Sequence, residues 1–518
     1  MSMLNELKNR TNLTTTENGA ITHETSNSYV LDLFAQGSAI RNKDARNRQE
    51  VNELFDKQRI FSMFDKAYAE DKLLTLKVLF YMRDIRGGQG EREIFKLLLN
   101  HLAIKEPEVV RKNLSLIAEY GRYDDLYCLF DTSLKDDVLK LFKEQLEEDL
   151  KSEYPSLLAK WLKSENTSSI TSRQLARKTM KGLGLSPKRY RKTLSLLRKK
   201  LKIVERDLSS KNYDEIDYSK IPSKAAMQYR QAFLRNDEER YTEYLDKLKN
   251  GDKSVKVNAK TLYPYEIVNK VYEGYWSTNK ITKETKTLMD AMWKSLPDYI
   301  NGSDLNGIAV VDVSGSMEGL PMEVAISLGI YLGERNVGPY KDHFITFSHK
   351  PKLQEIIGSD IYEKVNNLSR AEWGGNTNIE AVFDLILDIA IKNNMKQDDI
   401  PNKVFIISDM EFDYCARSNN YKNDFWTNES FGIAEQKTLF QEITERYEKA
   451  GYKMPGLVFW NVNSRNNNIP MTMSDSGVQL VSGCSPSIFE ALLQNQFLSA
   501  YDLMLKVINA SRYSAITI

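Results

Sequence analysis

The stretch Ile308-Ala-Val-Val-Asp-Val-Ser-Gly-Ser-Met317 decides the fold of the C-terminal half of this 518-residue chain. It begins as an apolar run of the kind that forms a buried strand. It then presents Asp312, Ser314 and Ser316 at alternate positions. Burying such polar side chains at the end of a strand costs free energy unless they have partners. We therefore predict that the strand ends here and that the three side chains hold a ligand.

The sequence from residue 301 to residue 518 alternates short apolar runs with amphipathic segments. We predict strands at 308–314, 343–348, 403–409, 456–463 and 477–483, and helices at 320–336, 379–391, 435–451 and from 486 onward. Apolar strands separated by helices indicate a parallel sheet buried on both faces. We expect a doubly wound α/β domain, in which ligands bind beyond the carboxyl ends of the strands. Residues 352–358 are predicted to form an antiparallel edge strand.

Two further oxygen-bearing residues are expected at the same edge of the sheet. Thr377 lies in the loop Trp373-Gly-Gly-Asn-Thr-Asn378, and Asp409 ends the apolar run that begins at residue 403. Carboxylates and hydroxyls are the ligands of hard cations, so Asp312, Ser314, Ser316, Thr377 and Asp409 together predict a Mg²⁺ or Mn²⁺ site. The structural alternative is that Asp312 and the serines only cap the following helix.

This arrangement resembles the metal-ion-dependent adhesion site of von Willebrand factor A domains, which combines a DxSxS motif with a loop threonine and a strand-end aspartate. The resemblance implies that a protein partner supplies an acidic side chain to the metal, without catalysis. A hydrolase is the enzymatic alternative, but Ser316 lacks the flanking glycines of a GxSxG motif and no phosphate-binding loop follows a strand. The long polar segments 411–435 and 461–476 are expected to flank the same edge.

The N-terminal half has a helical period from about Val51 to Trp293. Short polar breaks at 86–90, 121–124, 182–187 and 221–223 separate the helices. This pattern predicts antiparallel helix pairs stacked as an α-solenoid, with a simple bundle as the alternative. Around the glycine turn at 86–90 we expect Arg–Glu pairs that fix the neighbouring helices.

No acidic residue occurs between Glu165 and Glu205, and twelve basic residues lie in that interval. A helix face that is merely exposed to solvent usually carries charges of both signs. A run of positive charges without acidic residues therefore favours a phosphate backbone as the ligand, with an acidic protein surface as the alternative. The predicted RNA-binding residues are Arg173, Arg177, Lys178, Lys181, Lys188, Arg189, Tyr190, Arg191, Lys192, Arg198 and Lys199, with Lys200 and Lys202 completing the run. Tyr190 is the candidate surface on which a base could stack.

Several segments resemble the TROVE module of the Ro ribonucleoproteins. They are Tyr81–Phe95, Gly121–Leu126, Leu183–Glu205 and Ile221–Ala225. They resemble more strongly a group of relatives of unknown function that join such a module to a von Willebrand A domain. The resemblance implies a ring of HEAT-like helices that binds small noncoding or misfolded RNA, with residues 188–192 nearest the RNA. We expect a polar segment at 1–28, the helical module at 29–300 and the von Willebrand A-like domain at 301–518.

The bulk composition limits the remaining possibilities. The net charge is +1, so any nucleic-acid affinity must come from a local patch. The three cysteines show no CxxC spacing, which favours a reducing compartment. No apolar run has the length of a membrane span. We expect a monomeric cytoplasmic protein, either an RNA-binding scaffold with a metal site or a metal-dependent protein-interaction adaptor without RNA.

Overall fold

The structure is a computed structural model that describes residues 11–40, 50–276, 281–303, 305–346, 351–368, 378–413, 439–473, 475, 477–494 and 498–518. The chain forms two compact units. The sheet unit comprises Met1–Glu70, Tyr263–Asn279 and Asp298–Val507, and the helical unit comprises Asp71–Leu262, Lys280–Pro297 and Ile508–Ile518. The predicted combination of a helical N-terminal region with a C-terminal α/β region is confirmed.

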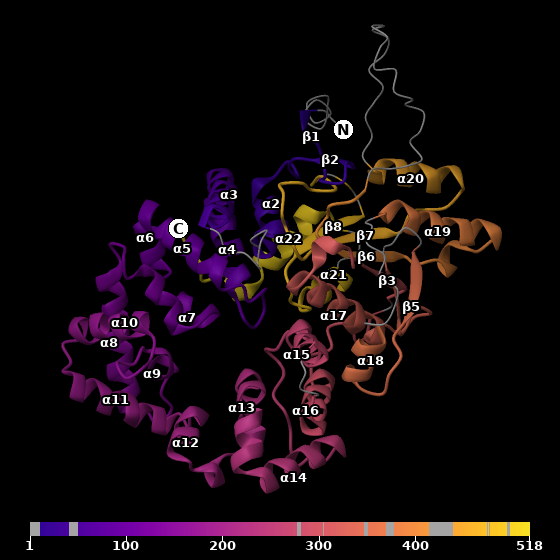
Figure 1. Ribbon diagram of the computed structural model, residues 1–518. Helices are drawn as coiled ribbons and strands as arrows, with labels where there is room; N and C mark the ends of the chain where they lie inside the picture. The colour runs from indigo at the N-terminus through magenta and orange to yellow at the C-terminus, as the bar shows by residue number, and fades with distance from the viewer. Residues whose placement is uncertain are drawn as a thin grey trace. The chain divides into compact units, whose positions relative to one another are not determined.

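The sheet unit is built on six strands in the order β5-β4-β3-β6-β7-β8 (Figure 1). The strands are β3 (Gly307–Val311), β4 (His343–Thr346), β5 (Lys352–Glu355), β6 (Lys403–Ser408), β7 (Gly456–Asn461) and β8 (Val478–Ser482). All neighbours pair in parallel except β4 and β5, so the predicted antiparallel edge strand is confirmed. Every residue of β3, β6 and β8 is buried, as continuous apolar strands require.

The order of the strands creates a switch point between β3 and β6. The chain leaves β3 for β4 on one side and later returns to β6 on the other side. The carboxyl ends of these two neighbouring parallel strands therefore lie at a switch point, the place where α/β proteins bind ligands. The oxygen-bearing residues predicted from the sequence follow these two strands.

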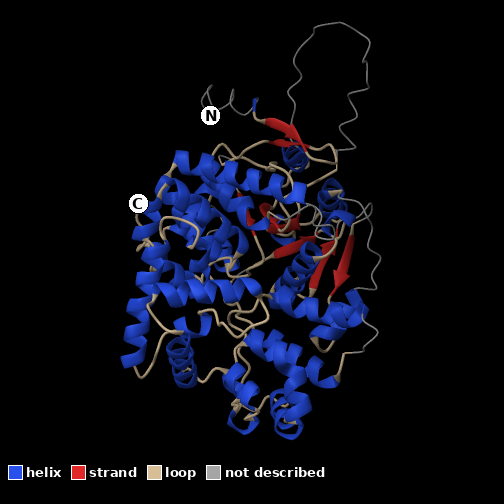
Figure 2. Cartoon of the chain, turned by 60° about the vertical axis from the view of Figure 1, so that its left-hand side comes forward, coloured by secondary structure: helices blue, strands red, loops and turns tan. Residues whose placement is uncertain are grey.

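Helices surround the sheet. They are α2 (Tyr29–Gln36), α3 (Glu50–Glu70), α15 (Pro264–Trp276), α17 (Leu320–Arg335), α18 (Ile361–Leu368), α19 (Ile379–Lys392), α20 (Leu439–Lys449), α21 (Ile488–Gln494) and α22 (Ala500–Ile508). Helix α17 packs against β3, β4 and β6, whereas α2 packs against β7 and β8. Figure 2 shows the sheet in red among these helices and, apart from it, the short hairpin of β1 (Leu13–Thr15) and β2 (Ile21–His23).

The compact units do not follow the domain boundaries expected at residues 28 and 300. Helix α2 belongs to the sheet unit, where the Ser482 hydroxyl donates to the Phe34 carbonyl at 2.9 Å. Helix α15 also belongs there and packs against α17, with the Asn269 amide 2.9 Å from the Glu323 carboxylate. Helical periodicity in a sequence predicts that a helix has an apolar face, but it does not predict which hydrophobic core buries that face.

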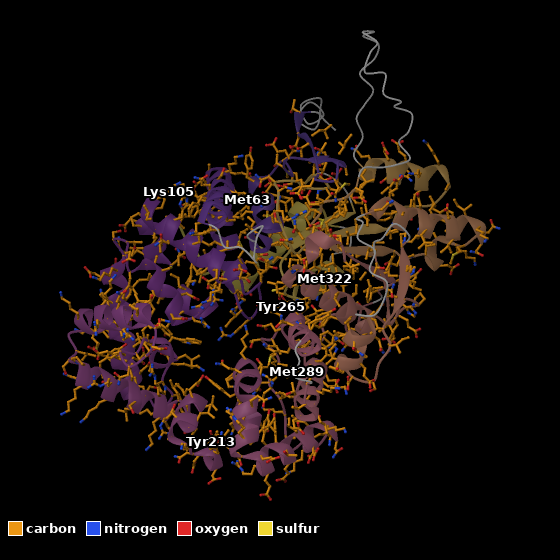
Figure 3. The ribbon with its side chains drawn as sticks, viewed as in Figure 1. Met63, Lys105, Tyr213, Tyr265, Met289 and Met322 are labelled. Carbon is orange, nitrogen blue, oxygen red and sulfur yellow. The ribbon has the colours of Figure 1, made fainter. Side chains whose placement is uncertain are left out.

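The helical unit consists mostly of short helices. They are α4 (Lys72–Arg83), α5 (Glu93–Lys105), α6 (Pro107–Lys112), α7 (Leu116–Tyr120), α8 (Lys135–Lys151), α9 (Leu158–Trp161), α10 (Ile170–Gly182), α11 (Pro187–Lys200), α12 (Val204–Ser210), α13 (Ser223–Asn236), α14 (Glu238–Lys249) and α16 (Lys283–Lys294). Neighbours in sequence pack on each other, as in α4–α5, α8–α9 and α13–α14. Met289, which Figure 3 labels, is among the buried side chains of this unit.

A buried charge network ties two sequence motifs of the helical unit together. Arg83 at the end of α4 contacts Asp125 at 2.7 Å, and Arg92 contacts Asp124 at 2.7 Å and Asp125 at 3.0 Å. The Arg–Glu pairing predicted for this turn is therefore replaced mainly by Arg–Asp pairing with the segment at 121–126. Gly121 allows the approach, because a Cβ there would lie 2.4 Å from the Asp125 carboxylate.

One buried cation in the sheet unit makes stability depend on pH. The Lys403 ammonium donates to Gln479 and to the Leu492 carbonyl, both at 3.0 Å, and burial lowers the pKa of Lys403 to about 8. Between this pH and about 10.4, the ordinary value for lysine, the unfolded chain binds more protons than the native chain. Over that window, stability relative to Lys403→Met should rise by up to about 1.4 kcal/mol per pH unit. Urea unfolding at a series of pH values measures this difference, with exposed Lys392→Met as a control that should show no such slope.

Candidate functional site

The predicted oxygen cluster forms where β3 and β6 end. Asp312 directly follows β3, and its backbone N–H donates to the Ile407 carbonyl of β6 at 3.0 Å. Asp409 directly follows β6. Because the two strands are parallel neighbours, their carboxyl ends place both aspartates at the same edge of the sheet. Both side chains are buried.

The backbone and neighbouring hydroxyls hold Asp312 in one orientation. Its Oδ1 accepts from the Ser314 N–H at 2.9 Å, and its Oδ2 accepts from the Ser408 hydroxyl at 2.6 Å. Ser408 in turn accepts from the Met410 N–H at 3.0 Å. Ser408 was not singled out from the sequence, because a serine inside an apolar strand gives no sign of which carboxylate it will meet.

The two serines of the motif lie together beside the aspartates. Their hydroxyl oxygens are 2.9 Å apart, and either hydroxyl could donate to the other. The turn that carries them is a short 3₁₀ helix, Gly315–Met317, that leads into α17. The structure thus brings together Asp312, Ser314, Ser316 and Asp409, while Thr377 lies outside the described residues.

The electrostatics of this edge favour a bound cation. Burial, followed by repulsion from Asp409, raises the pKa of Asp312. Burial also raises the pKa of Asp409, and the Ser316 hydroxyl and the Arg465 guanidinium partly offset that rise. Asp409 Oδ2 is buried without a hydrogen-bond partner. Two buried carboxylates that repel each other, with one oxygen unsatisfied, fit a hard divalent cation held by oxygen ligands.

Helix capping does not account for these contacts. The first helical residues of α17 follow Gly319, and no side-chain cap is formed there. Within the described residues, no group of three or more His, Cys, Asp or Glu side chains could hold a metal. The cluster here offers two carboxylates and two hydroxyls, a ligand set suited to Mg²⁺ or Mn²⁺ and not to a thiophilic metal.

The segment after β7 also reaches this edge, as predicted for residues 461–476. The Asn463 amide lies 3.5 Å from the Ser316 carbonyl, and Arg465 Nε lies 3.4 Å from Asp409 Oδ2. The N-terminal hairpin reaches the edge as well, with Glu17 Oε2 2.6 Å from Arg465 Nη2. No pattern in the sequence predicted this hairpin contact. Most of the other predicted flanking segment, residues 414–435, lies outside the described residues.

Some side chains of the basic interval are buried or bonded to other residues of the helical unit, whereas others are exposed to solvent. The prediction that Tyr190 offers a stacking surface is wrong, since Tyr190 is buried and its hydroxyl donates to the Lys163 carbonyl at 2.8 Å. Arg198 is also engaged, because its guanidinium donates to the carbonyls of Ala159 at 2.8 Å and Leu162 at 3.0 Å. Arg173 donates to the Thr167 and Ser168 carbonyls. These residues hold the fold of the unit.

Several other cations of the interval form ion pairs. Arg191 and Arg177 lie 3.3 Å and 3.7 Å from Glu165, and Lys178 lies 2.9 Å from Asp131. The Lys200 ammonium donates to the Leu150 and Ser152 carbonyls. Lys181, Lys188, Arg189, Lys192 and Lys199 are exposed and show no ion pair within the described part of the chain.

Three of the available lysines form a stripe on α11. Lys188, Lys192 and Lys199 are spaced by four and seven residues, so they share one face of the helix. The opposite face carries Tyr190, Leu194 and Leu197, which are buried. The three lysines, called here the α11 lysine stripe, therefore point to solvent.

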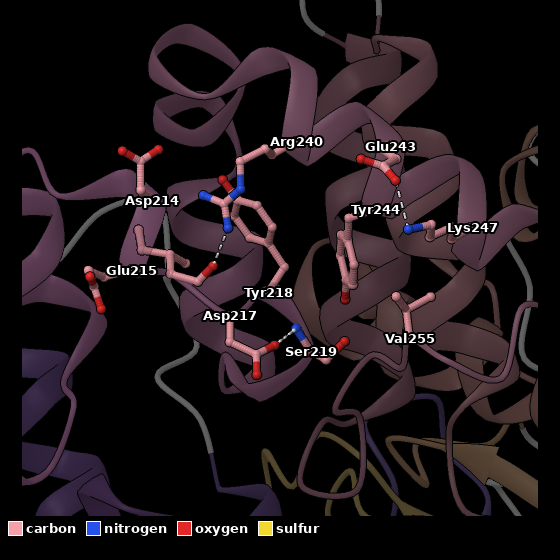
Figure 4. A pocket seen from close by; sticks show the side chains of 11 residues that line it. Asp214, Glu215, Asp217, Tyr218, Ser219, Arg240, Glu243, Tyr244, Lys247 and Val255 are labelled. Atoms are coloured by element: carbon pink, nitrogen blue, oxygen red, sulfur yellow. Dashed lines mark hydrogen bonds and ion pairs between the residues drawn. The ribbon is translucent and has the colours of Figure 1, made fainter.

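A separate hollow of about 380 Å³ lies in the helical unit near Tyr218, Arg240 and Tyr244 (Figure 4). Several of the charged groups that line it have partners, since Glu243 pairs with Lys247 at 2.7 Å and Asp217 with Lys220 at 2.8 Å. Arg240 donates to the Tyr213 and Ile216 carbonyls. We assign no ligand to this hollow.

Fold and site together define a protein that joins a helical unit to a parallel-sheet unit with an oxygen-rich site at its switch point. The chain belongs to the family of the domain of unknown function DUF2828, whose model matches residues 16–183 and 155–303. A second model, the domain of unknown function DUF7788, matches residues 306–511 and so covers the six-stranded sheet.

A viral protein is similar to this chain over most of its length. The uncharacterized protein L728 of Acanthamoeba polyphaga mimivirus is 31% identical over 537 aligned residues, which cover 96% of this chain and 87% of the relative. The alignment therefore extends over both units of this chain. Among the helices that the structure describes, none is long and apolar enough to cross a membrane.

Proposed function

We propose that the sheet unit is a metal-dependent ligand-binding module, in which Asp312, Ser314, Ser316 and Asp409 hold Mg²⁺ or Mn²⁺. The observation that carries this proposal is the pair of buried aspartates with an unsatisfied oxygen at the switch point. Thr377 joins the ligand set by its resemblance to the loop threonine of von Willebrand A domains. The positive charge of the metal attracts an acidic side chain of a protein partner, and that side chain can complete the coordination shell of the metal.

Direct metal binding tests this function. Electron paramagnetic resonance of Mn²⁺ titrated into the full chain should show one site per molecule, and Mg²⁺ should compete for it. Asp312→Asn should weaken the site at least about 100-fold, because even residues that only orient metal ligands cost about 10–100-fold when lost. If the full chain binds no Mn²⁺, or if the variant binds it equally well, the proposal is wrong.

We propose as a second function that the helical unit binds RNA through the α11 lysine stripe. The specific observation is that Lys188, Lys192 and Lys199 share a solvent face without an acidic partner in the described part of the chain. A row of like charges on one helix face suits a phosphate backbone. The resemblance to the TROVE module of Ro ribonucleoproteins supports small noncoding or misfolded RNA as the ligand, and HEAT-like stacking of the helices as its frame.

Removing the stripe should change how RNA affinity depends on salt. The triple variant Lys188→Gln, Lys192→Gln, Lys199→Gln should bind a single-stranded RNA oligonucleotide more weakly and lower the slope of log affinity against log salt by about 2. This expectation follows from about 0.7 per phosphate contact on single strands. Fluorescence anisotropy from about 50 to about 200 mM salt measures the slope.

The matched control carries the same charge change on another helix of the same unit. Lys140, Lys143 and Lys151 are exposed on α8, among acidic residues. Their triple glutamine variant should retain the wild-type slope. Equal slopes for the stripe variant and the wild-type protein, with both folded, would contradict RNA binding at α11. If the stripe variant keeps its RNA affinity and loses binding to an acidic protein, the α11 lysine stripe binds protein, which would favour the adaptor function.

A further inference from the structure

The N-terminal hairpin covers the segment that follows β6, next to the candidate metal site. The Thr16 hydroxyl donates to the Phe412 carbonyl at 2.6 Å, and the Asn18 amide donates to the Glu411 carbonyl at 2.6 Å. The Glu17 N–H donates to the Glu411 carboxylate at 2.7 Å. These contacts fix the turn between β1 and β2 beside Asp409, which is only two residues before Glu411.

Arg465 lies between this turn and the metal site. Its Nη2 contacts Glu17 Oε2 at 2.6 Å, and its Nε lies 3.4 Å from Asp409 Oδ2. The first contact is close, and Glu17 is further held by the Asn466 amide at 2.9 Å. The second contact is long and has no hydrogen-bond geometry, since both Arg465 Nε and Asp409 Oδ2 are buried without a hydrogen-bond partner.

We propose that Arg465 is a resident cation of the metal site that competes with the divalent ion for Asp409. This inference rests on the proposed metal-binding function. Asp409 is fully buried, so its charge needs a counter-charge whether or not a metal is bound. The guanidinium supplies that charge in the metal-free protein through a loose contact, and Glu17 retains it when a divalent cation takes Asp409 Oδ2. Arg465 thereby sets the affinity for the metal.

If Arg465 competes with the metal, substitutions of Arg465 and Glu17 should change the Mn²⁺ affinity in opposite directions. Arg465→Gln removes a positive charge beside the site, so Mn²⁺ affinity should rise by about tenfold or more. Glu17→Gln removes the carboxylate that draws the guanidinium away, so affinity should fall. Arg465→Lys keeps the charge and should stay close to the wild-type affinity. A residue with a merely structural role would give no such change of sign.

Mn²⁺ titration of the full chain by electron paramagnetic resonance, with thermal unfolding of each variant, tests the inference. Arg335→Gln is the matched control, since Arg335 lies at the C-terminal end of α17, away from the helix start near the site, and should leave affinity unchanged. If the wild-type protein binds one Mn²⁺ and Arg465→Gln does not bind it more tightly, the inference fails and the metal site stands. If neither protein binds Mn²⁺, the metal-binding function itself fails.

Discussion

Replacing Arg83 with methionine should lower the free energy of unfolding of the helical unit by about 3 kcal/mol or more. Arg83 and Asp125 are almost entirely buried, at 2% and 0% exposure, and their closest atoms are 2.7 Å apart. Removing one partner of a buried ion pair leaves the other charge without compensation, and this costs far more than the pair itself contributes. Arg92 remains 3.0 Å from Asp125 and keeps the loss near the lower end of the usual range of about 3–5 kcal/mol.

Two further variants separate this effect from a general loss of charge. Arg111 pairs with Glu108 and Asp137 at the surface of the same unit, so Arg111→Met should cost much less stability than Arg83→Met. The double variant Arg83→Met, Asp125→Leu should recover part of the loss, because it removes both buried charges. Urea unfolding followed by circular dichroism measures all three. An equal cost for Arg83→Met and Arg111→Met would show that the buried network does not stabilise the unit.

Asp312→Asn should stabilise the protein in the absence of divalent cations. The change keeps the shape of the side chain and removes a charge that is fully buried and repelled by Asp409. Replacing a buried ion pair with well-packed apolar side chains of similar volume is often neutral or stabilising by about 1–4 kcal/mol, because charges are costly to bury. We expect a gain within that range in the presence of a chelator, lessened by the weaker acceptor that Asn offers to the Ser408 hydroxyl.

Divalent cations should reduce or reverse the stability advantage of Asp312→Asn. At about 100 times the wild-type dissociation constant, Mg²⁺ should stabilise the wild-type protein by about 2.7 kcal/mol and the weaker site of Asp312→Asn by no more than about 0.4 kcal/mol. Thermal unfolding with chelator and with Mg²⁺ measures the four values. Asp398→Asn, a change of an exposed aspartate in the same unit, should follow the wild-type pattern. A variant that is destabilised in chelator yet still stabilised by Mg²⁺ would show that Asp312 is not a metal ligand.

Local sequence patterns were enough to predict the sheet and most of the candidate metal site. The apolar runs that became β3, β6, β7 and β8 are continuous because parallel strands are buried on both faces. Since parallel strands end at one edge, the acids that follow β3 and β6 could be placed together before any coordinates were known. The helical period of the N-terminal half was equally local, and it predicted the helices and the breaks between them.

The interpretation of individual cations was less successful, for a physical reason. Tyr190 and Arg198 belong to a basic run in the sequence, but α11 turns one of them into the core and the other onto the carbonyls of α9. The sequence shows where positive charges lie along the chain. Whether a cation can contact a ligand depends on the direction in which its side chain leaves the helix. Within the described part of the basic run, Lys181, Lys188, Arg189, Lys192 and Lys199 remain candidates for a phosphate backbone, and three of them form the α11 lysine stripe.

The sequence by itself determined the elements, their burial and the residues that end β3 and β6, because strand and helix periods are set by neighbours along the chain. Only the tertiary structure decided which units the helices join, which aspartates Arg83 and Arg92 meet, and that Glu17 and Arg465 reach the edge beside Asp409. These contacts join residues far apart in sequence, and their partners are selected by the shape and charge of the folded surface, which no local pattern encodes.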